Sequence, residues 1–92
     1  MPDLPLVTRS VRDGGQPSTA APFRTGSFLA ERQFWAWMRG QGIAGALTGD
    51  GLVRVMTPGG LRTVNAGQCV IQGPVNVRIV AQAAADALPD GP

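Results

Sequence analysis

The sequence predicts a mainly β protein: a small antiparallel meander (a barrel, roll or sandwich) with one short α-helix and an extended N-terminal arm. Three observations support this fold class. Residues 51–81 form four short runs of strand-forming residues, separated by turns that contain glycine or proline. Residues 27–40 combine helix-favouring residues with helix end signals. Residues 1–26 hold four of the eight prolines and show little periodicity.

A chain of 92 residues is expected to form one domain. We place an extended N-terminal arm at 1–26, a single β-rich domain at 27–88 and a C-terminal tail at 89–92. Only the stretch from Leu6 to Arg12 has strand patterning within the arm, so we expect most of the arm to lie outside the core. A domain this small buries only about 60–65% of its unfolded surface. Docking onto a partner or a second copy would therefore stabilise it.

The helix is expected over residues 27–39. Ser27 can cap its N-terminus, Arg39 suits the last turn, and Gly40 suits the position just after the helix. Glu31 is expected on the helix surface. A strand is the alternative, because residues 34, 36 and 38 also alternate with residues 35 and 37.

Aromatic side chains are confined to one short window of the chain. The five are Phe23, Phe28, Phe34, Trp35 and Trp37. Burying one such ring contributes about 2–3 kcal/mol, so this window is important to whatever it packs against. We expect it to cover the aliphatic sheet and to present part of its wide apolar surface to a partner.

A β-hairpin is expected around Pro58-Gly59-Gly60, and we predict a three-residue loop. This register places Val53, Val55, Leu61 and Thr63 on one face of the hairpin. The other face then carries Arg54, Met56, Arg62 and Val64. A two-residue loop would instead separate Arg54 from Arg62, because a shift of one residue moves every side chain of a strand to the other face.

The remaining elements are short. We expect strands at 43–47, 69–72 and 75–81, of which the last alternates most regularly, and a helical turn or two at 82–88. Cys69 is the one cysteine and lies in an apolar strand, where we expect it to behave as a small hydrophobic residue.

The stretch from Gly51-Leu52-Val53 to Gly67-Gln68-Cys69-Val70-Ile71 resembles the strand–turn–strand rhythm of cupin-type β-rolls. It contains none of the histidines that those proteins use to bind metal, and we assign no family from it.

The composition argues against catalysis and metal chemistry. All eight basic residues are arginine, the chain has no histidine or lysine, and the net charge is +2. A serine or cysteine nucleophile lacks its usual base, a zinc site lacks its Cys/His cluster, and no phosphate-binding glycine motif matches. We expect no cofactor, no signal peptide and no membrane-spanning segment. A virion or cytoplasmic location follows as the expectation.

By elimination, the leading hypothesis is a non-catalytic structural subunit that forms a homo-oligomer and joins another protein in a larger assembly. A small virion protein of a tailed phage, such as a capsid decoration or a head or tail component, fits this description. The predicted partner contacts are Leu4, Leu6, Val7, Phe23, Phe28, Trp35 and Trp37. The first three are expected to pair by their main chain with the sheet edge of a neighbour.

Two alternatives belong to other classes. A small basic nucleic-acid-binding module would use an arginine cluster on one sheet face, formed by Arg54, Arg62 and Arg78. No aromatic residue interleaves with these arginines for base stacking. A small-ligand-binding β-barrel is the third hypothesis, and it requires an internal cavity.

Overall fold

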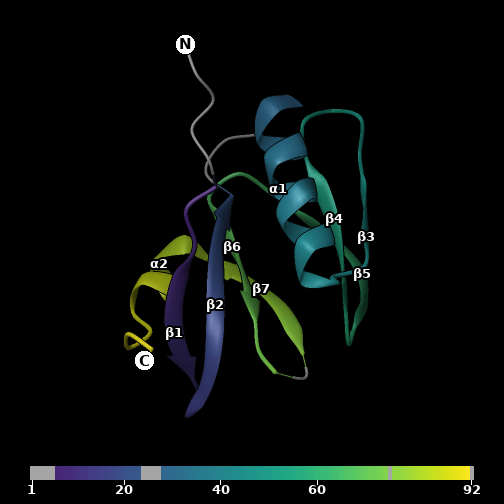
Figure 1. Cartoon of the computed structure of the whole chain (residues 1–92). Helices are drawn as coiled ribbons and strands as arrows, with labels where there is room; N and C mark the ends of the chain where they lie inside the picture. Colours follow the sequence, from purple (N-terminus) through teal and green to yellow (C-terminus); the bar gives the residue numbers. More distant parts are fainter. Residues whose placement is uncertain (1–5, 24–27, 75, 92) are drawn as a thin grey trace.

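The computed structural model describes residues 6–23, 28–74 and 76–91. These residues form two antiparallel sheets, one main helix and one short C-terminal helix (Figure 1). One sheet has the strand order β1-β2-β6-β7 and the other the order β3-β4-β5. The mainly β prediction is therefore confirmed, in the form of two sheets that do not close into a barrel.

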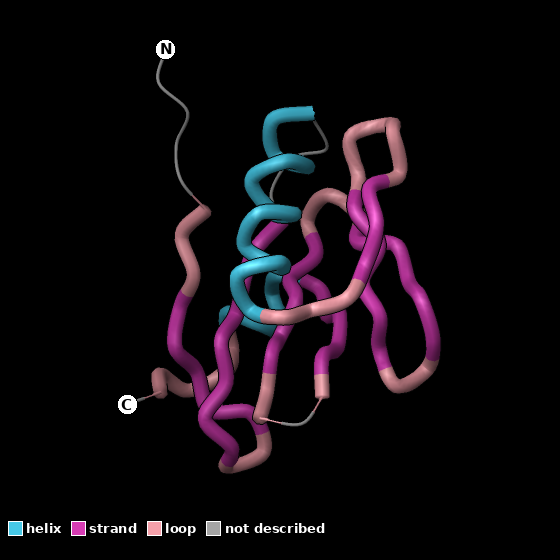
Figure 2. Tube along the Cα trace, turned by 45° about the vertical axis from the view of Figure 1, so that its right-hand side comes forward, coloured by secondary structure: helices cyan, strands magenta, loops and turns pink. Residues whose placement is uncertain are grey.

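The elements, in chain order, are β1 (Arg9–Asp13), β2 (Gln16–Phe23), α1 (Phe28–Gln41), β3 (Gly45–Leu47), β4 (Val53–Thr57), β5 (Gly60–Val64), β6 (Gln68–Gln72), β7 (Val77–Ala81) and α2 (Gln82–Asp86). Figure 2 shows α1 on the outside of the molecule, in front of the strands. Among the described residues, no helix is long and apolar enough to cross a membrane.

Residues 9–23 form a β-hairpin that belongs to the larger sheet. Gly14 and Gly15 make its two-residue turn with φ of 60° and 82°, which suits a hairpin because both turn positions need positive φ. The hairpin buries Val11, Ala20 and Phe23. The expectation that most of residues 1–26 lie outside the core is therefore wrong for this segment.

Strand β2 contains two prolines although it lies between β1 and β6. Pro17 pairs with Arg12 of β1, but β6 reaches only as far as Thr19. Pro22 pairs with Cys69 of β6, but β1 reaches only as far as Ala20. Alternation along the strand points each proline nitrogen toward the side where the neighbouring strand is missing. Neither proline therefore removes a ladder hydrogen bond, which is the usual reason that proline is excluded from a sheet interior.

The helix is confirmed, but it ends later than predicted. Gly42, and not Gly40, follows its last residue, with φ of 73°. The N–H of Gly42 donates to the carbonyl of Arg39 (3.2 Å), and that of Ile43 donates to the carbonyl of Met38 (2.9 Å). These two bonds satisfy the last helical carbonyls in the pattern typical of a glycine C-cap.

The main core lies between α1 and the two sheets. Its buried members are Ala21, Phe23, Phe34, Met38, Ile43, Val53, Val55, Val64 and Val70. The rings of Phe23 and Phe34 meet edge to face at 5.5 Å between centroids, and those of Phe34 and Trp37 meet at 5.4 Å. The aromatic window therefore packs largely against the protein's own sheets, which confirms the expectation that it covers the aliphatic sheet.

The β4–β5 hairpin has a two-residue loop, so the predicted three-residue register is wrong. Val53 pairs with Val64, Val55 pairs with Arg62, and Thr57 pairs with Gly60. This register places Val53, Val55 and Val64 together on the inner face, where all three are fully buried. The partly exposed pair Met56 and Leu61 then faces outward.

Glu31 is buried, which contradicts its predicted place on the helix surface. Its Oε2 accepts a hydrogen bond of 2.8 Å from the backbone N–H of Gly51. The carboxylate thus joins α1 to the loop between β3 and β4, because a buried polar group needs a partner of this kind.

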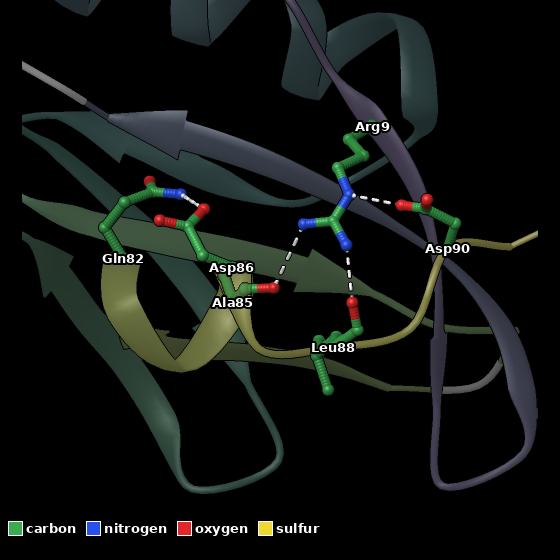
Figure 3. Close-up of polar contacts among 6 residues, drawn as sticks. All are labelled: Arg9, Gln82, Ala85, Asp86, Leu88 and Asp90. Carbon is green, nitrogen blue, oxygen red and sulfur yellow. Dashed lines mark hydrogen bonds and ion pairs between the residues drawn. The ribbon is translucent and has the colours of Figure 1, made fainter.

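The described part of the C-terminal tail is attached to β1. Arg9 donates from Nε to Asp90 Oδ1 (3.0 Å), from Nη1 to the Ala85 carbonyl (3.3 Å) and from Nη2 to the Leu88 carbonyl (2.5 Å) (Figure 3). Together with α2, this segment covers a second cluster of buried residues on the outer face of the larger sheet. Its members are Val11, Ala20, Cys69, Ile71 and Ala85.

Candidate interaction site at the free edge of β7

The larger sheet has two outer edges, β1 and β7, and they differ. At the β1 edge, the N–H of Arg12 donates to the Pro89 carbonyl (2.8 Å), and the N–H of Gly91 donates to the Ser10 carbonyl (2.9 Å). Residues 89–91 therefore occupy this edge. No described strand pairs with the outer side of β7. An unpaired edge presents a row of donors and acceptors to any extended chain.

Two hydrogen bonds flank the β6–β7 ladder and define which way its groups point. Gly73 N–H donates to the Asn76 carbonyl (2.8 Å), and Gln82 N–H donates to the Gly67 carbonyl (3.0 Å). Because bonded and non-bonded pairs alternate in an antiparallel ladder, Arg78 and Val80 bond to β6. The N–H and C=O groups of Val77 and Ile79 point toward the open edge.

A groove of about 580 Å³ runs along this edge. Three consecutive residues of β7, Val77, Arg78 and Ile79, form one wall. Successive side chains of a strand point to opposite faces, so a lining of three in a row means that the edge itself borders the groove. The β4–β5 hairpin forms the other wall, and Asn65 and Gln68 also line the groove.

Arg62 gives the groove a positive charge. Arg62 reaches into it from β5, is exposed, and has no ion-pair partner among the described residues. Arg78 makes a two-bond pair with Asp13, from Nε to Oδ2 (2.9 Å) and from Nη2 to Oδ1 (2.5 Å). No acidic residue among those described lines the groove. A segment that carries carboxylates would therefore find complementary charge there.

The predicted partner contacts fall into different environments. Val7 is 73% exposed and Phe28 is 64% exposed, so both are accessible to a partner. Leu6, Trp35 and Trp37 are half-buried and pack against the main core. Leu4 lies outside the described residues.

Phe23 is 1% exposed and lies in the main core. Its prediction as a partner contact is therefore wrong. The position of Phe23 on β2, with its side chain toward Phe34, gives the ring an intramolecular role.

The predicted arginine cluster does not form. Arg54 pairs with Thr63 on the outer face of the smaller sheet, whereas Arg62 pairs with Val55 on the inner face. Only Arg62 and Arg78 line the same groove, and Arg78 already holds Asp13. The sheet-face nucleic-acid site is therefore wrong as predicted, because it depended on the three-residue loop.

The groove edge itself was missed by sequence reasoning. The alternation of residues 75–81 predicts the strand, and β7 confirms it. Nothing in that pattern tells whether β7 is central or peripheral, since this depends on where β1 and residues 89–91 are placed. The proline and two glycines of the 58–60 turn predict only that a hairpin stands nearby.

The described residues offer little for other chemistry. Within residues 6–23, 28–74 and 76–91, no group of three or more His, Cys, Asp or Glu side chains is arranged to hold a metal ion. Burial and, to a smaller extent, the Asp86 carboxylate raise the pKa of the Cys69 thiol to about 11. A buried thiol with a raised pKa is a poor nucleophile, because the thiolate is the reactive form.

Cys69 should make the fold sensitive to alkaline pH. The folded-state pKa lies above the ordinary value of 9.0, so the folded state binds the thiol proton more tightly. Stability is therefore fully present below pH 9 and falls as pH rises toward 11. The chain has no lysine, tyrosine or histidine, so no other side chain titrates in this window.

Denaturant unfolding measured between pH 9 and 11 should show this fall in the free energy of unfolding in the wild type and not in Cys69→Ala. Equal slopes in both proteins would contradict the assignment.

Comparison with protein-family models, with curated proteins and with solved structures finds no match for this chain.

Proposed function

We propose that the protein is a non-catalytic assembly subunit that binds an extended segment of a partner protein along the free edge of β7. The contrast between the two sheet edges carries this proposal. The chain covers the β1 edge with its own residues 89–91 and leaves the outward main-chain groups of Val77 and Ile79 without a strand partner among the described residues. Strand addition uses such groups for affinity and the adjacent groove for specificity.

Charge favours an acidic segment as the occupant. Arg62 has no acidic partner among the described residues, whereas Arg78, on the same groove, is already paired with Asp13. A second copy that paired through its own β7 would bring a second Arg62 to the junction, where like charges oppose one another. A partner strand with carboxylates on alternate residues would direct them to one face, toward Arg62.

A peptide of alternating valine and glutamate, about eight residues long to match a typical strand, is a suitable probe. On its addition we expect the amide protons of Val77 and Ile79 to exchange more slowly, measured by NMR. Arg62→Glu should weaken binding about tenfold or more, because it replaces an attractive charge with a repulsive one. Arg54→Glu is the matched control, since it makes the same change on the opposite face of the same hairpin.

Three results would contradict the proposal. The first is equal binding of a valine–lysine peptide, and the second is an equal loss of affinity in the two arginine variants. The third is protection of Val77 and Ile79 without any peptide, together with a dimer by light scattering. That result would show that a second copy occupies the edge.

The homo-oligomer, its N-terminal contacts through Leu4, Leu6 and Val7, and the virion role stay predictions. The structure changes how the N-terminal contacts are tested. A truncation at residue 22 would remove β1 and most of β2, and with them part of the core. The deletion must therefore end before Arg9, where β1 begins, so that loss of assembly is separated from loss of folding.

A further inference from the structure

One line of side chains on α1 alternates aromatic rings with guanidinium groups. Phe28, Arg32, Trp35 and Arg39 follow one another at intervals of four, three and four residues, the intervals that place helical side chains side by side. We call these four residues the α1 ridge. At 1.5 Å per residue the ridge is about 16 Å long. Its two aromatic residues are about 10 Å apart along the helix axis, and so are its two arginines.

The ridge lies along the edge of the buried face of α1. The buried residues of the helix are Glu31, Phe34 and Met38, and they point into the molecule. Phe28 is 64% exposed, and both arginines are exposed. Trp35 is half-buried against the main core, so its ring is held in place while its outer part is accessible.

The ridge also carries two positive charges that form no ion pair with any described residue. No ion pair or hydrogen bond joins the guanidinium group of Arg32 or Arg39 to another described residue. The one acidic residue of α1, Glu31, is buried and accepts its hydrogen bond from Gly51. On the adjacent loop, Asp50 accepts a hydrogen bond from the Thr48 hydroxyl. No aromatic residue interleaves with the arginines of the predicted sheet-face cluster. On α1, by contrast, arginines and aromatic residues lie side by side.

We propose that the α1 ridge binds single-stranded nucleic acid. Arg32 and Arg39 would contact phosphates, and Phe28 and the outer part of Trp35 would stack on bases. This occupant fits because such proteins combine cationic tracks with aromatic platforms. Among the described residues of α1, Leu29 is the one other exposed large apolar side chain, and the ridge itself is half charged. The cores of protein interfaces are instead depleted in charged residues. The site is distinct from the β7 groove, and its test involves no groove residue.

The affinity of the ridge for a single strand should fall with salt by a predictable amount. Release of counterions from single strands lowers log K with a slope of about −0.7 per neutralised phosphate. Two arginine–phosphate contacts predict a slope of about −1.4, so affinity should fall about sevenfold between 50 and 200 mM salt. The double variant Arg32→Gln/Arg39→Gln should lose most of this salt dependence.

The experiment uses the full chain and a labelled oligothymidylate of about 12 nucleotides, within the range of known single-strand sites. Fluorescence anisotropy measures affinity, and tryptophan emission reports stacking. Quenching on binding should persist in Trp37→Phe and disappear in Trp35→Phe. Phe28→Ala should weaken binding about tenfold, a stacking contribution of ordinary size. Arg54→Gln serves as the control for charge, because Arg54 lies on the outer face of the smaller sheet.

The proposal is overturned if the oligonucleotide does not bind at 50 mM salt, or if duplex DNA binds as tightly. It is also overturned if Arg54→Gln weakens binding as much as the double variant, or if quenching depends on Trp37 in place of Trp35. Circular dichroism of each variant separates a loss of binding from a loss of folding.

Discussion

Replacing Phe34 by alanine should destabilise the protein by about 3–5 kcal/mol, the range for removing a buried phenylalanine. Phe34 is 1% exposed and contacts two other rings, Phe23 at 5.5 Å and Trp37 at 5.4 Å. The variant therefore loses apolar burial and two edge-to-face contacts, and it leaves a cavity between α1 and the sheets. Since small domains are stable by only about 5–15 kcal/mol in total, this loss is a large fraction of the free energy of unfolding.

Phe28→Ala is the matched control for this prediction. It removes the same side chain from the same helix, at a position that is 64% exposed. Surface substitutions of this kind change stability by about 0.5 kcal/mol or less. Guanidinium chloride unfolding of both variants, followed by tryptophan fluorescence, gives the comparison. Similar losses in the two variants would mean that Phe34 does not hold the core together.

Gly45→Ala should destabilise the protein by about 3 kcal/mol or more, at the upper end of the cost of overpacking. A Cβ at this position would collide with the backbone carbonyl oxygen of Arg54 and with the Cε of Met38. The methionine end can move, but the carbonyl belongs to the β3–β4 ladder and cannot move without breaking it. Glycine is required at this position because β3 passes close to both α1 and β4.

Gly40→Ala tests the same change where space is free. Gly40 lies within α1, its φ is not positive, and nothing lies within 4 Å of the added Cβ. Alanine in a helix is more stable than glycine by about 0.5–1 kcal/mol. Thermal unfolding should therefore move in opposite directions for the two variants. A shift of the same sign and size in both would refute the steric explanation for Gly45.

The strands and turns of residues 51–81 and the helix α1 could be predicted because both depend on local chemistry. Side-chain alternation and turn residues act over a few positions, and β4, β5, β6 and β7 follow from them. The hairpin register could not be predicted in the same way. The turn sequence permits two loop lengths. The choice between them depends on the burial of Val64 beside Val53, which is part of the packing of the whole core.

The N-terminal hairpin shows most clearly where prediction from local sequence fails. Pro17 and Pro22 argue locally against a strand, and they are tolerated only because each lies where a neighbouring strand has ended. The burial of Glu31 depends likewise on the Gly51 N–H, which the β3–β4 loop brings to it. Neither fact can be read from residues adjacent in the sequence.

The sequence by itself determined a small β-rich fold with one aromatic helix, and the shortage of residues for common catalysis and metal binding, since these follow from residue types and local order. Only the tertiary structure decided which sheet edge is open, which arginines share a groove, and which aromatic rings are accessible. The physical reason is that an edge, a groove and an exposed ridge are defined by what fails to cover them. That depends on the packing of segments far apart in the chain, as Ser10 and Gly91 show at β1.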